Sequence, residues 1–268
     1  MNVRPAAVAG SFYPGEPHRL RSMVEMLLDR APEPVDTPPG GQSLKAVIVP
    51  HAGYVYSGST AAQGYRRLAA LADQVKHVVI VGPTHRVGIR GIALPDAGAM
   101  ATPLGDVPLW EEGVRIGIAQ PAVQISAAVH AQEHSLEVQL PFLQVVLPQA
   151  DILPLAAGWV EPAVVTTVLD AVWDQPGTVI VISSDLSHYH PYDQANAIDR
   201  ATVAQIMALD ATIDHDQACG ATGVDALLLA ARARGLTPRL EGLRNSGDTA
   251  GDKTGVVGYV AVSFCEEG

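Results

Sequence analysis

Cysteine and long apolar runs are both scarce in this sequence. Its 268 residues include two cysteines, Cys219 and Cys265, too few for a disulfide framework, and we therefore expect a reducing, cytoplasmic setting. No apolar run approaches the ~20 residues that span a bilayer, and the N-terminus, MNVRPAAVAGSFYPG, lacks the apolar core of a secretion signal. No basic amphipathic stretch indicates a membrane surface either, so we expect no membrane partner.

Positive charge is scarce as well. Seventeen Lys and Arg stand against 28 Asp and Glu, which gives a net charge of −11. Duplex binding needs clustered Lys and Arg to neutralise phosphates, and we therefore expect no nucleic-acid partner. Aromatic residues make up only 5% and charged residues 17%, whereas apolar residues make up 48%. A chain this rich in Ala, Val and Leu suits a buried sheet covered by helices.

Strand-like and helix-like stretches alternate along the chain after a Pro- and Gly-rich segment, residues 31–43, which we interpret as a loop. Short apolar runs predict strands at residues 44–49, 77–81, 151–154, 178–182, 239–243 and 256–264. Helical patterns occupy residues 16–30, 59–73, 133–146, 162–173, 191–209 and 223–234. The alternation predicts an α/β fold with a mostly parallel central sheet and helices on both faces, in a single domain spanning residues 1–268.

Three of the predicted strands are followed by side chains that bind metals or protons. KAVIVPHAGY carries His51, HVVIVGPTHR carries His85, and TVIVISSDLSHYH carries Asp185, His188 and His190. Residues just past the C-terminal ends of parallel strands collect along one edge of the sheet, where ligands bind. A single histidine after a strand would most often cap a loop or face solvent. Three equivalent placements instead predict one shared site.

Two segments outside these strands add further candidates. AQEHSLEVQLPFL, residues 131–143, places His134 before an apolar helical stripe, as an acid/base or substrate-orienting group; plain helix capping is the alternative. Its spacing is not HExxH, so no zincin is predicted. Cys219 precedes a predicted helix, where a lowered thiol pKa favours binding of soft or borderline metals; a buried structural cysteine is the alternative.

A glycine-rich segment near the end of the chain, NSGDTAGDKTGVVGY, covers residues 245–259. Its backbone N–H groups are suited to cradling an anion, and a plain turn before the last strand is the alternative interpretation. It does not match GxxxxGK[ST], so a nucleotide-binding P-loop is not predicted.

The motifs AGSFYPG, VPHAGYVYSG, GPTH, EHSLEVQLPFL, SSDLSHY, ACG and GDKTGVVGY occur in this order. Together they resemble the Memo family, which includes the Memo-like component of the prokaryotic AmmeMemoRadiSam system (system protein B), over about residues 4–264. The resemblance implies a fold like that of class III extradiol (LigB-type) nonheme iron dioxygenases. It also implies a metal held by His51, His85 and Cys219, with Asp185 and His188 as further pocket residues.

The resemblance leaves three functions open. The first is a redox or oxygen-dependent enzyme acting on an unidentified small molecule, in which iron(II), or alternatively copper or zinc, is the cofactor and His134, Asp185 and His188 are catalytic. The second is a non-catalytic scaffold or peptide-binding protein with a vestigial metal site. The third is a protein that sequesters iron or copper. Dioxygenases of this type use two histidines and a carboxylate, and the cysteine here departs from that set, so whether the chain is an enzyme stays undecided. A homo-oligomer is a base-rate expectation.

Overall fold

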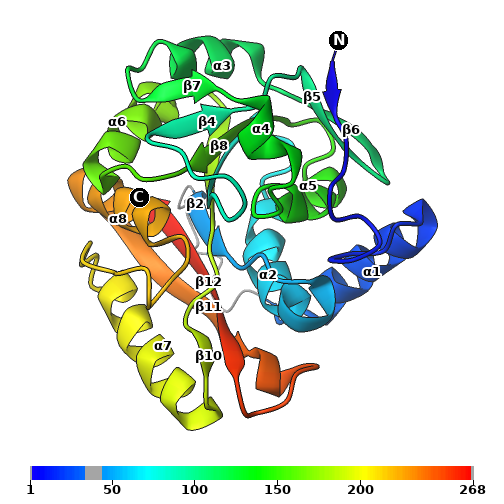
Figure 1. Cartoon of the computed structure of the whole chain (residues 1–268), viewed down its shortest axis with the longest axis vertical. Coiled ribbons are helices and arrows are strands. Elements are labelled where there is room, and N and C mark those ends of the chain that lie inside the picture. Colours follow the sequence, from blue (N-terminus) through cyan, green and yellow to red (C-terminus); the bar gives the residue numbers. More distant parts are fainter. Residues whose placement is uncertain (1, 34–43, 267–268) are drawn as a thin grey trace.

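The computed structural model describes residues 2–33 and 44–266, and a nine-stranded sheet runs through the middle of this part (Figure 1). The four central strands are parallel, in the order β2 (Leu44–Val49), β9 (Thr178–Ser183), β3 (His77–Pro83) and β8 (Asp151–Ala157). Beside β2 lies β12 (Val256–Glu266), which also pairs with β11 (Leu236–Asn245) and β10 (His188–His190). Beside β8 lies β4 (Ile92–Leu94), which also pairs with β7 (Val123–Ile125). Because β12 and β4 join this centre antiparallel, the sheet is mixed, with the predicted parallel strands in its core.

The central strands form where the sequence has unbroken apolar runs. LKAVIV of β2 and TVIVIS of β9 are buried along nearly their whole length, as expected of parallel strands covered on both faces. The predicted strand starts at residues 44, 77, 151 and 178 are confirmed, and β3, β8 and β9 continue one to three residues beyond the predicted ends.

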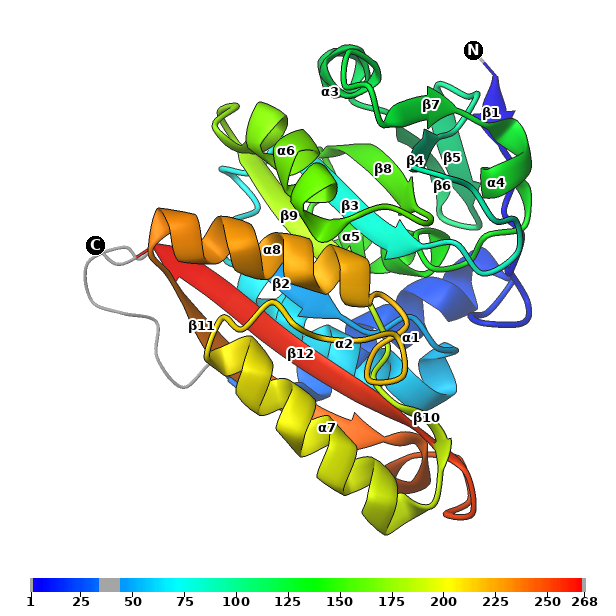
Figure 2. The ribbon, with the colours of Figure 1, turned by 60° about the vertical axis from the view of Figure 1, so that its left-hand side comes forward.

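Helices cover both faces of the sheet, as predicted. On one face lie α1 (Pro17–Arg30), α2 (Tyr54–Ala69) and α5 (Leu140–Val146). On the other lie α6 (Pro162–Trp173), α7 (Tyr192–Met207) and α8 (Ala221–Arg234), with α3 (Glu111–Ile118) packed against α6. Figure 2 shows α7 and α8 lying alongside β12 on this second face. The helices on each face pack against the sheet around a separate cluster of buried apolar side chains.

Two predicted helices start four or five residues away from their predicted positions, whereas the other predicted starts differ by two residues or fewer. The helix predicted from residue 59 begins at Tyr54, in α2. The helix predicted from residue 133 begins only with a 3-10 turn, η1 (Glu137–Gln139), followed by α5. Residues 133–136 stay outside the helix because the Glu133 carboxylate accepts the backbone N–H groups of the next two residues.

The segment between β3 and α5 contains elements that no sequence pattern predicts. Beside β4, β7 and α3 it holds the short helix α4 (Ala127–Ala131) and the hairpin β5 (Ala99–Thr102) and β6 (Gly105–Pro108). This hairpin and β1 (Val3–Arg4) form a separate three-stranded sheet. Strands of two to four residues are too short for a period to emerge. Most of the predicted loop at residues 31–43 lies outside the described residues.

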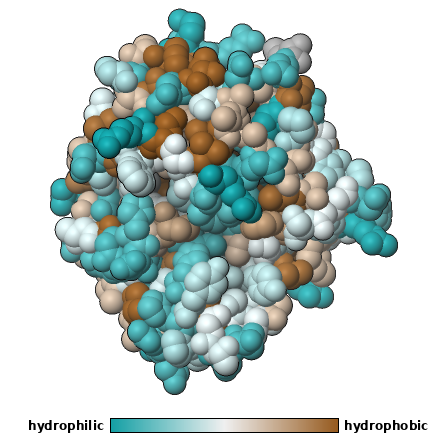
Figure 3. All heavy atoms as spheres, in the orientation of Figure 1, coloured by the Kyte–Doolittle hydropathy of each residue, from teal (hydrophilic) through white to brown (hydrophobic). Residues whose placement is uncertain are grey.

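None of the described helices combines the length and apolar character needed to cross a bilayer. On the face seen in Figure 1, hydrophilic atoms are widely spread, and hydrophobic ones gather mainly over the region of α3, β7 and β4 (Figure 3).

Candidate metal centre

Three neighbouring parallel strands deliver polar side chains to one edge of the sheet. His51 follows the end of β2 by two residues, His85 follows β3 by two, and Asp185 follows β9 by two. One ligand nitrogen each from His51, His85 and His134 lies within 4.8 Å of the others. These residues line a cleft of about 810 Å³. The structure therefore brings the three strand ends together on one cleft, as the sequence predicts, with His134 beside them.

His51 is held in one tautomer by a buried hydrogen-bond chain. Its Nδ1 lies 2.9 Å from Ser183 Oγ. That hydroxyl donates its proton to the Ser135 carbonyl at 2.6 Å and accepts from Gln139 Nε2 at 2.8 Å. Because the Ser183 hydroxyl already donates its proton to the Ser135 carbonyl, it can only accept from His51. Nδ1 of His51 must therefore be the donor, so Nε2 keeps its lone pair.

The orientation of the Gln139 amide, on which this assignment depends, is itself fixed. Tyr65 donates its hydroxyl to Gln139 Oε1 at 2.8 Å, and Gln139 Nε2 donates to the Pro50 carbonyl at 3.0 Å. A flipped amide would place Oε1 against the Pro50 carbonyl, where neither oxygen has a proton to donate. Burial, reinforced by the nearby histidines, lowers the pKa of His51 well below its usual value, so the ring is neutral and ready to bind a cation.

Glu133 orients His85 in a similar way. Its carboxylate lies 2.9 Å from His85 Nδ1 and accepts the backbone N–H of His85 at 2.5 Å. Burial by itself would raise the pKa of Glu133, but the hydrogen bonds from the His85 ring, the His85 backbone and the Ser135 backbone hold it far below its usual range. The charged carboxylate therefore accepts the Nδ1 proton, which leaves Nε2 as the nitrogen of His85 that is available to a metal. Carboxylate–histidine pairs of this kind are common behind metal ligands.

His134 lies against His85, with ring centroids 4.6 Å apart, and against Phe12 at 4.7 Å. Among the described residues its buried Nδ1 makes no hydrogen bond, although it lies 3.4 Å from Glu133 Oε1. Burial lowers its pKa to about 4, although the neighbouring Glu133 charge acts in the opposite direction. A neutral imidazole with an orphaned nitrogen fits a metal ligand or a proton-handling group equally well.

Cys219 lies beside His51, with its Sγ 3.3 Å from His51 Nε2. It lies two residues before the start of α8, but the expected lowering of its pKa by the helix start is wrong. Burial, together with the Asp185 carboxylate, raises the pKa of the thiol to about 12. Desolvation outweighs the helix dipole here, so the metal-free thiol is protonated.

Asp185 and His188 both lie on the same cleft. Asp185 Oδ1 accepts the backbone N–H of His51 at 2.8 Å, and its Oδ2 lies 4.0 Å from His51 Nε2. Burial raises the pKa of Asp185 to about 7, although backbone N–H groups of His51 and Ala52 oppose the rise. Burial also lowers the pKa of His188, the first residue of β10.

The N-terminal segment supports the site through a buried ion pair that the sequence did not reveal. Arg4 pairs with Glu137 and donates to the backbone carbonyls of His130 and Glu133. Glu137 also accepts the Tyr13 hydroxyl at 2.5 Å. The AGSFYPG motif is thereby fastened to the segment that carries Glu133, which places Phe12 against His134.

Other residues of the site also escaped sequence reasoning. Ser183 and Gln139 read as ordinary strand and helix residues, and Glu133 as a helix-capping group. The signal available was their position: Ser183 ends β9 and is the first residue of the SSDLSH motif, and Glu133 directly precedes His134.

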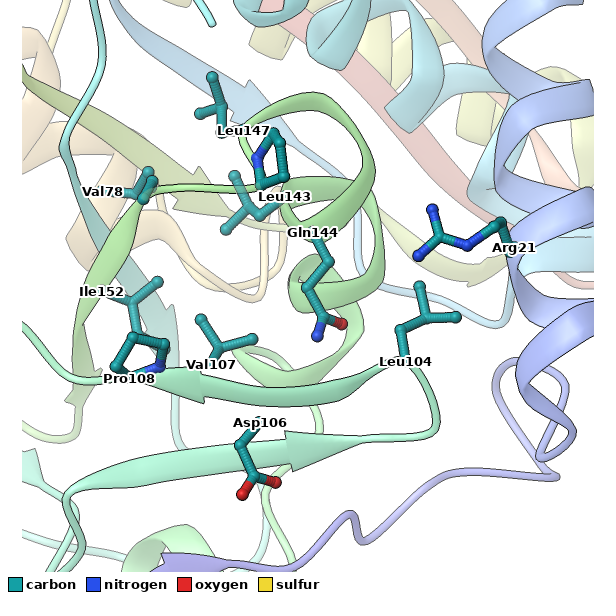
Figure 4. Close-up of a pocket in the computed structure, with 12 residues that line it drawn as sticks. Arg21, Val78, Leu104, Asp106, Val107, Pro108, Leu143, Gln144, Leu147 and Ile152 are labelled. Carbon is teal, nitrogen blue, oxygen red and sulfur yellow. The ribbon is translucent and has the colours of Figure 1, made fainter.

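A second cavity of about 260 Å³ lies between α5, the β5–β6 hairpin and α1 (Figure 4). It is lined mainly by apolar side chains such as Leu143, Leu147 and Ile152, with Arg21 and Asp106 at its rim. None of the described residues lining it is a histidine or cysteine. Among the described residues, the grouping of side chains that could hold a metal ion therefore lies in the first cleft.

The comparisons with known proteins agree on one family. A family profile described as "Memo-like protein" matches residues 4–263. "MEMO1 family protein MK0963" of Methanopyrus kandleri is 36% identical, covering 97% of this chain and 98% of that protein. "MEMO1 family protein" sequences of Sulfolobus acidocaldarius and Aquifex aeolicus are each 34% identical and cover 98% of this chain and 99% and 100% of those proteins.

Among solved structures, "Crystal structure of uncharacterized protein JW3007 from Escherichia coli K12" is similar with a TM-score of 0.53. The match covers 82% of this chain and 99% of that one at 13% identity, which shows a shared fold. Because both the profile and the relatives align along nearly the whole length, the chain belongs to the Memo family.

Proposed function

We propose that this protein binds one transition-metal ion through His51, His85 and Cys219, and that iron(II) is the native metal. The observation that carries the proposal is that the imidazoles of His51 and His85 are each oriented by a hydrogen bond at Nδ1. Both Nδ1 atoms are engaged away from the cleft, by Ser183 and by Glu133, which leaves both Nε2 atoms for a metal. The Cys219 sulfur lies 3.3 Å from His51 Nε2. Two imidazoles and a thiolate suit iron, copper or zinc, and they are poor ligands for magnesium or calcium.

We further propose that the metal serves a redox or oxygen-dependent reaction on a small molecule. Bound iron(II) would supply one-electron and oxygen chemistry. The chain's own part is to bind the substrate in the cleft and to handle protons there. His134, with its orphaned Nδ1, and His188 are the candidate proton carriers. Asp185 holds the His51 backbone and so keeps the ligand loop in place.

Metal content of matched variants tests the binding step. The chain would be reconstituted anaerobically with iron(II), copper(I) or zinc, and its metal stoichiometry measured after desalting. We expect one ion per chain, and a sharp loss in His51→Ala, His85→Ala and Cys219→Ser, with Cys265→Ser as the matched control. Full occupancy in Cys219→Ser would contradict the thiolate assignment. If His134→Ala loses the metal instead, the third ligand is His134.

Oxygen uptake by the iron-loaded chain tests the reaction. Candidate catechols would be supplied one at a time, with the His188→Ala variant as a comparison. Turnover that falls in the variant supports the enzyme, whereas tight metal binding without any oxygen uptake favours the sequestration alternative.

A further inference from the structure

The cleft at the metal centre extends well beyond the three histidines. It continues along Tyr56 in the first turn of α2, Tyr189 in β10, Tyr259 in β12, and the loop that carries Asp252. We call Tyr56, Tyr189 and Asp252 the tyrosine wall. We propose that the tyrosine wall binds a cationic alkylammonium group of the molecule that occupies this cleft. The proposal deepens the proposed function, since it names the substrate class of the same site.

Tyr189 is the first observation behind this inference. Its side chain is 79% exposed, and its φ of 61° puts a non-glycine residue in the left-handed region. That conformation is costly for a residue with a bulky side chain, and such strain persists where the surrounding structure imposes it, often at ligand sites. The pairing of β10 with β12 shifts register between His188 and His190, so Tyr189 stands out of the ladder. The strain therefore holds an exposed aromatic ring on the wall of the cleft.

The second observation is that another exposed ring lies on the same cleft. Tyr56 is 39% exposed although it lies in the first turn of α2, and its neighbour Tyr54 is buried. Exposed tyrosine rings gain little for folding, but their faces attract cations. The backbone of Tyr189 is in turn packed against Gly255, three residues after Asp252 in the glycine-rich loop. Tyr56, Tyr189 and Asp252 therefore line the same cleft.

Charge is the third observation. No lysine or arginine is found among the described residues that line the cleft. Asp252 accepts the Thr254 backbone N–H at 2.8 Å and the Thr254 hydroxyl at 2.6 Å, and these bonds lower its pKa, so it is ionised. Among the described residues Lys253 forms no ion pair with Asp252; its Nζ lies 4.1 Å from the ring centroid of Tyr192, which is not among the cleft residues.

A second basic residue outside the lining acts at the other part of the cleft. Arg86 follows His85 directly, and its positive charge contributes to the lowered pKa of His134. The cleft is therefore polarised. Its histidine part is positive once a metal is bound, and its tyrosine wall offers π faces and one carboxylate. A molecule with a metal-binding group at one end and an alkylammonium at the other matches both parts, whereas an anionic tail at the tyrosine wall would be repelled by Asp252.

Choline and its uncharged isostere 3,3-dimethyl-1-butanol provide a matched pair of probes. Binding to the full chain would be measured by calorimetry or ligand-observed NMR, in the metal-free and in the iron-loaded protein. We expect choline to bind about 2- to 30-fold more tightly than the isostere, the range typical of cation–π contacts. Tyr189→Ala and Asp252→Asn should each weaken choline binding, whereas Tyr189→Phe should retain it. Trp159→Ala, which removes an 80% exposed ring outside the cleft, is the control.

Equal binding of the two probes, or no binding of choline, would overturn the inference. So would displacement of choline by phenyl phosphate with higher affinity, since the wall would then favour anions. Choline binding to the metal-free chain does not depend on the metal, and metal content is measured separately. Failure of choline binding in a chain that binds the metal therefore contradicts this inference, whereas failure of metal binding in a chain that binds choline contradicts the proposed metal site.

Discussion

One buried side chain, that of Glu133, orients several groups of this site. Its carboxylate accepts the His85 ring and the backbone N–H groups of His85, His134 and Ser135, while the residue is only 1% exposed. It therefore sets the tautomer of one candidate ligand and the position of another. A glutamine at this position keeps the shape, but it removes the negative charge that makes the His85 ring a stronger donor to a cation.

We predict that Glu133→Gln lowers metal affinity about 10- to 100-fold, as is typical when the partner of a ligating histidine is lost. The measurement is a competition titration against a chromophoric chelator. Glu161→Gln, at the exposed start of α6, serves as the control. Unchanged affinity in Glu133→Gln would mean that the His85–Glu133 pair has no role in metal binding.

His130 is a buried histidine outside the metal centre, and it makes stability depend on pH. Its Nε2 lies 3.0 Å from the Ala93 carbonyl, and burial lowers its pKa to about 4, against the effect of that hydrogen bond. The folded chain thus keeps His130 neutral at a pH where the unfolded chain protonates it. This contribution to stability is complete above the unfolded pKa of 6.5 and is lost as pH falls from there through about 4.

For the variant His130→Gln we therefore predict a shallower fall in unfolding free energy between pH 7 and pH 4. The difference from the parent chain should be at most about 3 kcal/mol over this interval. Urea unfolding at several pH values measures it, with the exposed His18→Gln as control. Parallel pH profiles for parent and His130→Gln would refute this origin of the slope.

At the scale of elements, the loop that carries Asp185 and His188 is fastened between α7 and β12. Leu186 N–H donates to the Gly258 carbonyl at 2.8 Å, and Gly258 N–H donates to the Ser187 carbonyl at 2.9 Å. Asp199 of α7, 1% exposed, accepts the Ser187 N–H at 3.1 Å. A Cβ added at Gly258 would come within 2.1 Å of Asp199 Oδ2. Glycine is needed here for the close approach of helix and strand.

We predict that Gly258→Ala destabilises the fold by about 1–3 kcal/mol, the usual cost of overpacking. Asp199→Ala removes the clashing carboxylate, so the double variant should lose less stability than the sum of the two single variants, with a coupling of about 0.5–3 kcal/mol. Denaturant unfolding of all four proteins measures the cycle. Strict additivity would show that the two residues are not in contact.

The whole molecule is acidic, with a net charge of −11, and Figure 3 shows hydrophilic atoms over much of one face. We predict that the chain has no salt-sensitive affinity for DNA or RNA, because its excess negative charge opposes the approach of phosphates. Gel-shift assays at two salt concentrations, with a duplex and with single-stranded RNA, test this. Submicromolar binding at about 0.1 M salt, weakened by added salt, would contradict it.

At this scale the sequence by itself determined the architecture and the positions of three residues of the site. The apolar runs of β2, β3, β8 and β9 are strong local signals, because a strand buried on both faces must be apolar throughout. Once parallel strands are predicted, their C-terminal ends must share an edge. His51, His85 and Asp185 therefore come together by topology alone, whatever the loops between them do. The ordered motifs add the family, because they are spread along nearly the whole chain.

Only the tertiary structure decided how those residues are tuned. The tautomer of His85 depends on Glu133, 48 residues away in sequence, and that of His51 depends on Ser183, 132 residues away. The raised pKa of Cys219 depends on how completely the folded chain removes it from water, which no local pattern records. The short strands β4 and β7 exist because the sheet edge offers them a partner, and their three residues carry no period of their own. Position along one strand is a local property, whereas protonation and orientation arise from contacts made across the whole fold.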